Sequence, residues 1–291
     1  KAVRAARAAM EGAWGRLTAT ERGRILVKAA TLIVQNADEI AQIEWLDTGK
    51  PLSVARADVV AVARYFEYFG GAADKLHGEQ IPYLNGYNVQ LVYEPHGVVA
   101  AIIPWNYPAQ MFGRTVAPAL AAGNAVVLKP SEDACMSGLK LAQLLMEAGL
   151  PAGALNLVTG YGHEAGAALT AHPDINFACF TGSPEVGVLV QQSTALNAVP
   201  CTLELGGKSP QIVFEDADLD KALPIIVKAI TQNAGQTCSA GSRLLIQESI
   251  YERFITRVAE AFRKVKVGTP EMDLDCGPIV NRKQYERVRN F

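Results

Sequence analysis

Six short apolar runs between Gly97 and Phe214 constrain the fold of this chain more than any other feature. They read VVAAIIP, AVVLKP, ALNLVTG, INFACFTG, CTLEL and QIVF, and stretches with helical periodicity separate several of them. Strands that are apolar along their whole length are buried on both faces, which is typical of a parallel sheet covered by helices. The sequence therefore predicts an α/β fold built on a parallel sheet.

Helices are predicted before this sheet, and a hairpin is predicted between the two regions. In residues 21–51, apolar side chains recur every three or four positions until Gly49 and Pro51, and a further helix is predicted at 53–71. In residues 78–97, the Asn-Gly pair predicts the turn of a β-hairpin whose second strand reads VQLVYE. Towards the end of the chain, we expect a helix near 218–233, a strand RLLIQ and a helix YERFITRVAEAFRKV.

The composition argues against several classes of partner. The chain has 291 residues, of which 49% are hydrophobic and 19% charged, and its formal net charge is -2. We therefore expect neither nucleic acid nor an anionic membrane as a partner. No apolar run approaches the ~20 residues that cross a bilayer. The basic, Ala-rich start lacks the apolar region of a signal peptide. Because it begins within a predicted helix, the sequence is compatible with a targeting segment upstream.

The cysteines and histidines form no metal or disulfide pattern. The five cysteines, at positions 135, 179, 201, 238 and 276, are widely spaced and include no CxxC pair. This spacing favours a reducing, cytoplasmic setting over a disulfide framework or a zinc site. No two of the four histidines have the i, i+4 spacing of metal ligands. We expect no metal site.

One cysteine, Cys238, lies in NAGQTCSAGSR among small and polar residues. Cys179 has instead the apolar neighbours of a thiol that serves packing. A thiol in a loop rich in Gly and Ser can be reached by a substrate, and nearby backbone amides can stabilise its thiolate. Cys238 is therefore a candidate nucleophile.

Further candidates follow the predicted strands, because ligands of open α/β sheets bind beyond the carboxyl ends of the strands. Asn106 lies between two prolines in PWNYP, which would hold its amide in place, although Asn alone is more often a turn residue. Lys129 and Glu132 in VVLKPSE could grip a ribose or a phosphate, or form a solvated strand end. Glu204 in LELGGKSP is a candidate general base or the partner in a structural ion pair.

Two glycine-containing segments are candidate phosphate sites. TGYGHEAG has the spacing GxGxxxG, which departs from the dinucleotide fingerprint GxGxxG. FTGSPEVG places Thr181, Gly182 and Ser183 between a strand and a helix with proline in its first turn. The exposed amides of such a helix start accommodate a pyrophosphate. The second segment is the better candidate.

The motifs PWNYP, KPSE, FTGS, LELGGKSP and GQTCSAGSR, in this order, together resemble the NAD(P)-dependent aldehyde dehydrogenase superfamily. The resemblance covers essentially the whole chain, including DTGKP in the early helices. It implies a Rossmann-like NAD-binding domain at 1–75 and 96–207 and a hairpin of an oligomerisation element at 76–95. It also implies the N-terminal part of an α/β catalytic domain at 208–291, and a homodimer or homotetramer of the full-length protein.

The resemblance further implies a mechanism. Cys238 would attack an aldehyde carbon to give a thiohemiacetal, and the Asn106 amide with the backbone N–H of Cys238 would form the oxyanion hole. Hydride transfer to the nicotinamide would leave a thioester, which water activated by Glu204 would hydrolyse. The resemblance also makes Lys129 a candidate catalytic residue. Glu204 argues against the alternative of a CoA-acylating enzyme. The presence of Cys238, Glu204 and Asn106 together argues against a non-catalytic relative. A third alternative is that the chain is only an NAD-binding fragment.

For the cofactor, the resemblance places Lys129, Ser131 and Glu132 at the adenosine ribose. Glu132 would accept a hydrogen bond from a 2′-hydroxyl and repel a 2′-phosphate, which favours NAD and leaves NADP open. The other implied cofactor contacts are Ile103, Pro104, Trp105, Gly162, Gly166, Phe180, Thr181, Gly182, Ser183, Val186, Glu204, Leu205 and Gly206.

For the substrate, the resemblance implies Tyr107, Met111 and Arg114. Arg114 occupies a position that is a substrate-facing arginine in semialdehyde and lactaldehyde members of the family, and a guanidinium there could bind a carboxylate. A structural ion pair is the alternative, and the frequent companion arginine six residues before the nucleophile is here Gln232. The family's later Glu-x-Phe-Gly-Pro segment has no counterpart in this sequence, so we expect the active enzyme to be longer.

Overall fold

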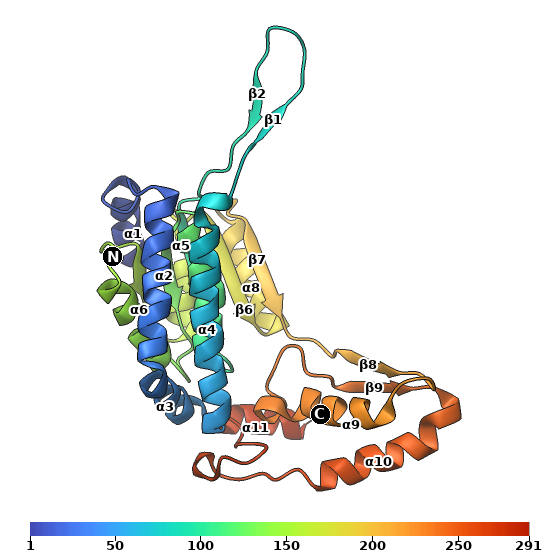
Figure 1. Ribbon diagram of the computed structural model, residues 1–291. Coiled ribbons are helices and arrows are strands. Elements are labelled where there is room, and N and C mark those ends of the chain that lie inside the picture. The colour runs from blue at the N-terminus through green and yellow to red at the C-terminus, as the bar shows by residue number, and fades with distance from the viewer. Residues whose placement is uncertain (291) are drawn as a thin grey trace.

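A five-stranded sheet lies at the centre of the computed structural model, which describes residues 1–290 (Figure 1). All four pairs of neighbouring strands are parallel. The predicted α/β fold with a parallel sheet is therefore confirmed, and five of the six apolar runs form this sheet. In spatial order its strands are β5 (Leu155–Leu157), β4 (Ala125–Lys129), β3 (Val98–Ile102), β6 (Phe177–Gly182) and β7 (Cys201–Leu205).

The first strand of the sheet in the sequence, β3, is also the central one. The chain passes outward through β4 to β5 and then returns to add β6 and β7 on the other side of β3. Right-handed crossovers in the two directions place helices on opposite faces of such a sheet. The point between β3 and β6, where the strand order reverses, is where open α/β sheets bind ligands. The connecting helices are α5 (Pro108–Ala121), α6 (Met136–Glu147), α7 (Ala167–Thr170) and α8 (Pro184–Ala195).

The predicted N-terminal helices are confirmed. A capping box between Thr18 and Glu21 starts the second of them, and the third ends at Gly49, whose φ of 73° favours glycine. The second and fourth helices approach closely, because a Cβ on Gly23 would lie 2.4 Å from the carbonyl oxygen of Gly70. These helices are α1 (Ala2–Glu11), α2 (Ala19–Gln35), α3 (Ala37–Thr48) and α4 (Leu52–Ala72).

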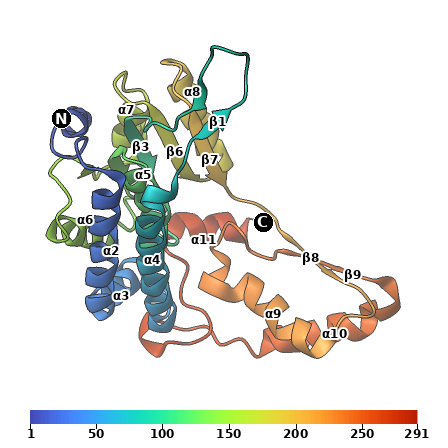
Figure 2. The same cartoon turned by 45° about the horizontal axis from the view of Figure 1, so that its top comes forward.

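The predicted hairpin is also confirmed, and it projects away from the body of the molecule (Figures 1 and 2). Its strands, β1 (Glu79–Ile81) and β2 (Val89–Leu91), pair antiparallel. The turn lies at the Asn-Gly pair, where Tyr87 N donates to Leu84 O at 3.2 Å and Gly86 has a φ of 86°. The hairpin exposes several large apolar side chains, among them Tyr83 and Tyr87.

The sixth apolar run belongs to a separate, two-stranded parallel sheet. Its strands are β8 (Pro210–Val213) and β9 (Arg243–Ile246). A small core of Val213, Ile226, Ile250, Phe254 and Val258 joins them to two of the helices in this part of the chain. Those helices are α9 (Leu219–Thr231) and α10 (Tyr251–Arg263), and α11 (Arg282–Arg289) follows. The proposed domain limits stay a prediction, as does the hairpin's role in assembly.

Shorter turns complete the structure. A π-helical turn spans Gly162–Gly166 before α7. Turns of 3₁₀ helix occur at Ala73–Lys75, Gln232–Gly235, Glu248–Ile250 and Pro270–Met272. Within residues 1–290, no helix combines the length and apolar character that crossing a membrane would require.

Candidate active site

The residues singled out in the sequence gather at one edge of the five-stranded sheet. The carboxyl ends of β3, β4, β6 and β7 lie there, because Ile102 is paired with both Lys129 and Phe180 in register. At the β6–β7 pair, Thr181 lies beside Glu204. The structure therefore brings the PWNYP, KPSE, FTGS and LELGG segments together, as the strand-end argument predicts.

The cysteine loop reaches this edge through strained backbone. Asn233 and Ala234 have φ values of 48° and 56°, and Gly235 follows at 76°. Left-handed backbone at a residue other than glycine costs on the order of 1–3 kcal/mol and persists only where other contacts hold it. Asn233 is buried and donates through Nδ2 to the backbone carbonyl of Asn106 at 2.9 Å. Cys238, three residues after this turn, is exposed.

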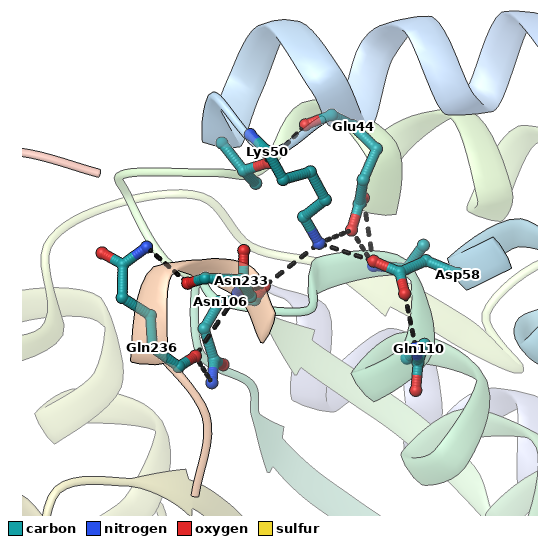
Figure 3. Close-up of polar contacts among 9 residues, drawn as sticks. Glu44, Lys50, Asp58, Asn106, Gln110, Asn233 and Gln236 are labelled. Atoms are coloured by element: carbon teal, nitrogen blue, oxygen red, sulfur yellow. Dashed lines mark hydrogen bonds and ion pairs between the residues drawn. The ribbon is translucent and has the colours of Figure 1, made fainter. Parts of the chain in front are cut away.

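Asn106 is bonded to the cysteine loop through its side chain as well. Its Nδ2 donates to the carbonyl oxygen of Gln236 at 2.9 Å, two residues before Cys238 (Figure 3). A side-chain amide nitrogen carries two N–H groups, and the bond to Gln236 uses one. The second N–H of the Asn106 amide could donate a hydrogen bond to an oxyanion.

Of the candidate substrate residues, Tyr107 contacts the cysteine loop, whereas Met111 is buried in the main core. Burial raises the pKa of the Tyr107 hydroxyl, and a hydrogen bond with the Thr237 side chain works in the opposite direction. Tyr107 is thereby placed against the residue that precedes Cys238. Met111 is 8% exposed and packs within the main core.

Glu204 lies at the exposed end of β7. The side chains of this edge strand alternate in exposure, so the Glu204 side chain is 53% exposed despite its apolar neighbours in sequence. It forms an ion pair with Arg114, whose Nη2 donates to Glu204 Oε2 at 3.0 Å. The nearby Gly207 approaches the cysteine loop, since a Cβ there would lie 3.6 Å from the carbonyl oxygen of Cys238. The candidate base and the candidate nucleophile thus lie on neighbouring segments.

The two candidate ribose contacts form a pair. Lys129 ends β4 with 2% exposure and donates through Nζ to Glu132 Oε2 at 2.6 Å. Partial burial opposes ionisation of Glu132, but the Lys129 ammonium and the backbone of Gly162 together hold the pKa of its carboxyl below the usual range. Glu132 is therefore an ionised acceptor at neutral pH. Ser131, between them, is buried and accepts a hydrogen bond from Asp133 N at 3.3 Å.

The remaining candidate cofactor contacts divide into supporting and exposed positions. Ile103, Gly166 and Phe180 are buried, and Pro104, Trp105, Thr181, Gly182, Ser183 and Leu205 are half-buried. A Cβ on Gly182 would lie 2.4 Å from the Phe180 ring, so a larger residue there would require this ring to move. Gly162, Val186 and Gly206 are exposed. Added Cβ atoms on Gly162 and Gly206 would meet nothing within 4 Å, which leaves these backbones open to a ligand.

The helix start after β6 is capped by its own side chain. Ser183 Oγ accepts from Val186 N at 3.4 Å, and Pro184 occupies the first helical turn. This is the N-terminal geometry that the FTGSPEVG pattern predicts.

A profile of the aldehyde dehydrogenase family matches residues 1–291. This chain belongs to the aldehyde dehydrogenase family. The resemblance inferred from the motifs is confirmed.

Relatives in the aldehyde dehydrogenase family match along the whole chain. An aldehyde dehydrogenase from Emericella nidulans is 45% identical over 100% of this chain and 59% of its own length. A crystal structure of a family member from Burkholderia cenocepacia is 62% identical, with a TM-score of 0.98 over 99% of this chain and 61% of that one. A Bacillus cereus aldehyde dehydrogenase solved with NAD+ is 43% identical, with a TM-score of 0.97 over 99% and 60%. This chain spans 55–60% of the length of the curated relatives it matches.

Sequence reasoning missed the residues that connect Asn106 to its surroundings. Three of them are the buried charged side chains Glu44, Lys50 and Asp58. The sequence does contain an indication of this buried charge. Glu44 lies four residues after the apolar Ile40 and therefore on the same, buried face of its helix. A carboxylate on an apolar helix face needs a partner. The lysine of DTGKP supplies it.

Proposed function

We propose that this chain supplies the cofactor-binding edge and the nucleophile of an NAD-dependent aldehyde dehydrogenase that oxidises an aldehyde to a carboxylic acid. One observation carries the proposal: the Asn106 amide is bonded to the cysteine loop at Gln236, next to the exposed Cys238. A thiol and an amide donor held together in this way suit attack on a carbonyl carbon and stabilisation of the resulting oxyanion. Because the chain spans 55–60% of its relatives' length, we assign the activity to the full-length gene product.

In this mechanism, the Cys238 thiolate attacks the aldehyde carbon and forms a C–S bond. The free N–H of the Asn106 amide and the backbone N–H of Cys238 stabilise the charge on the former carbonyl oxygen, typically by a few kcal/mol per donor. A bound NAD, held by Lys129, Ser131 and Glu132 at its adenosine ribose, would supply the hydride acceptor for the carbon attached to sulfur. The thioester that remains on Cys238 is hydrolysed by water from which Glu204 removes a proton.

Two features support NAD as the cofactor. The ionised Glu132, paired with Lys129, is an acceptor for a ribose hydroxyl and repels a phosphate at the same position. The open backbones at Gly162 and Gly206 leave room along the sheet edge. Lys129, Ser131 and Glu132 would hold the adenosine ribose, and the segment from Thr181 to Val186 the pyrophosphate. NADP is the less favoured alternative.

Glu204 must leave Arg114 to act as a base. Their ion pair is partly exposed, with side-chain exposures of 41% and 53%, and such pairs contribute at most about 1 kcal/mol. Arg114 can therefore exchange Glu204 for a substrate carboxylate at little cost. We infer that the substrate is an aldehyde with a polar or anionic group.

Two further observations bear on assembly and location. The projecting hairpin exposes apolar side chains such as Tyr83 and Tyr87, which supports a homodimer or homotetramer of the full-length gene product. The five cysteines are unpaired, which supports a reducing compartment such as the cytoplasm.

Burst kinetics test the mechanism. The full-length gene product is mixed with NAD and a panel of aldehydes, and NADH is followed by absorbance. In Glu204→Gln, we expect a burst of about one NADH per active site followed by slow turnover, because thioester hydrolysis is blocked. Cys238→Ala should give no burst. Absence of NADH formation with every aldehyde, despite NAD binding, would contradict the proposed function.

A further inference from the structure

A buried cluster of three charged residues lies behind the candidate oxyanion donor. We name Glu44, Lys50 and Asp58 the Lys50 cluster. Their exposures are 0%, 2% and 2%, and Lys50 Nζ lies 3.1 Å from Glu44 Oε1 and 2.6 Å from Asp58 Oδ2. Burying charges is costly, and apolar residues of similar volume are often as stable or more stable. These buried charges therefore indicate a role beyond packing.

The third donor of Lys50 indicates that role. An ammonium group has three N–H donors. Two of them bond to the carboxylates of Glu44 and Asp58, and the third reaches the backbone carbonyl of Asn106 at 3.1 Å (Figure 3). The Asn106 oxygen also accepts from Asn233 Nδ2 at 2.9 Å. All three donors of Lys50 are used, and both lone pairs of the Asn106 oxygen are occupied.

The two carboxylates of the Lys50 cluster hold the chain just beyond Asn106. Ala109 N, in the first turn of α5, lies 3.3 Å from Glu44 Oε2, and Gln110 Nε2 donates to Asp58 Oδ1 at 2.5 Å. The same cluster therefore fixes the carbonyl of Asn106 and the start of the helix that follows it. The segment from the Asn106 carbonyl to the first turn of α5 is therefore bonded at both of its ends to one buried cluster.

The charges of the cluster support each other. Burial lowers the pKa of the Lys50 ammonium, but Glu44 and Asp58 outweigh it and raise that pKa above its ordinary value. Lys50 therefore stays protonated and keeps three donors. Its Nζ also lies 4.7 Å from the centroid of the Tyr107 ring, a favourable cation–π distance.

We propose that Lys50, held by Glu44 and Asp58, is a positioning residue that aims the Asn106 amide at the developing oxyanion; this inference rests on the proposed function. Lys50 acts through Asn106 and touches neither substrate nor cofactor. Catalysis depends on such aim, since a displacement of 1 Å can cost on the order of 100-fold in rate. A purely structural role would instead weaken folding and cofactor binding together with turnover.

A double-mutant cycle in the full-length gene product separates these roles. Lys50→Met should lower kcat by roughly 10- to 100-fold and leave KM for NAD within about twofold, because only the aim of the amide is lost. In the Asn106→Ala background, the same change should cost less than about threefold, because residues that act as a unit are not additive. Equal losses in both backgrounds would overturn the inference.

Lys140→Met is the matched control. The Nζ atom of Lys140 lies 2.8 Å from a carboxylate oxygen of Glu39, and the Lys140 side chain is 16% exposed. Glu39 is on the same helix as Glu44. Loss of Lys140 should leave kcat within about twofold, because a partly exposed ion pair contributes little. If Lys50→Met does not fold, Lys50→Met with Asp58→Asn carries the cycle instead, since it removes one charge of each sign. Burial raises the pKa of Glu44, so the remaining carboxyl can take up a proton once Lys50 is removed.

Hydrogen–deuterium exchange gives a readout that needs no activity. Peptides covering residues 103–109 and 233–238 should exchange faster in the Lys50 variant than in the parent and in the Lys140 control. Unchanged exchange in these peptides would show that Lys50 does not hold the segment. If the parent oxidises no aldehyde, the proposed function is wrong, whereas the exchange comparison still decides whether Lys50 positions Asn106.

Discussion

Arg114 Nη2 donates a 3.0 Å hydrogen bond to Glu204 Oε2 and so connects α5 to the end of β7. The candidate substrate arginine and the candidate base therefore neutralise each other in this state. Both side chains are partly exposed, so the pair can separate at little cost. A substrate carboxylate that pairs with Arg114 would free Glu204 to accept a proton from water, as the proposed mechanism requires.

This relationship predicts the selectivity of Arg114→Leu. The kcat/KM ratio of succinic semialdehyde to a neutral aliphatic aldehyde should fall by roughly 10-fold, because a charge-assisted contact with the substrate is lost. Stability should change by less than about 1 kcal/mol, since the pair is exposed. Steady-state rates with both aldehydes and a thermal unfolding curve measure the two effects. An unchanged ratio would show that Arg114 does not face the substrate.

Glu132 is predicted to set the cofactor preference. Glu132→Gln should raise kcat/KM for NADP relative to NAD by roughly 10-fold, because a 2′-phosphate would no longer meet a like charge. The lowered pKa of Glu132 keeps its carboxyl ionised even within the ordinary titration range of glutamate, so the preference of the parent should be constant from about pH 7.5 to 9, where the 2′-phosphate is fully ionised as well. Glu147→Gln, at an exposed position on α6, is the control and should leave the ratio unchanged. A parent preference that varies across this pH range would contradict the assignment.

The sheet and the strand-end residues were predictable because they follow local rules. Apolar runs such as the one at β4, which is buried along its length, predict a parallel sheet. The carboxyl ends of its strands then fall on one edge without further information. Motif residues such as Asn106 and Glu204 could therefore be placed together from sequence alone.

The supporting contacts could not be predicted, because they depend on side chains that meet only after packing. Lys50 lies 56 residues before Asn106 in the sequence, and Asn233 lies 127 after it. Nothing in DTGKP shows that its lysine bonds a backbone carbonyl. Likewise, the exposure of Glu204 follows from the edge position of β7, which strand composition alone does not give.

The two thiols at 179 and 238 are predicted to differ sharply in reactivity. Burial raises the pKa of Cys179 to about 11, so about 0.1% of it is thiolate at pH 8. Cys238 is exposed, so iodoacetamide at pH 8 should modify it first, and peptide mapping by mass spectrometry measures the order. Cys179 should begin to react only as pH approaches 11, where its thiolate fraction becomes large. Faster modification of Cys179 in the native protein would contradict this assignment.

The crossing of α2 and α4 predicts opposite effects for two glycine substitutions. Gly23→Ala should lower the free energy of unfolding by about 1–3 kcal/mol, because its Cβ would lie 2.4 Å from the carbonyl oxygen of Gly70. Gly71→Ala is the matched control on α4, where a Cβ meets nothing within 4 Å. It should raise stability by up to about 1 kcal/mol, because alanine is the better helix former. Urea unfolding measures both, and equal effects would mean that the helices do not cross at Gly23.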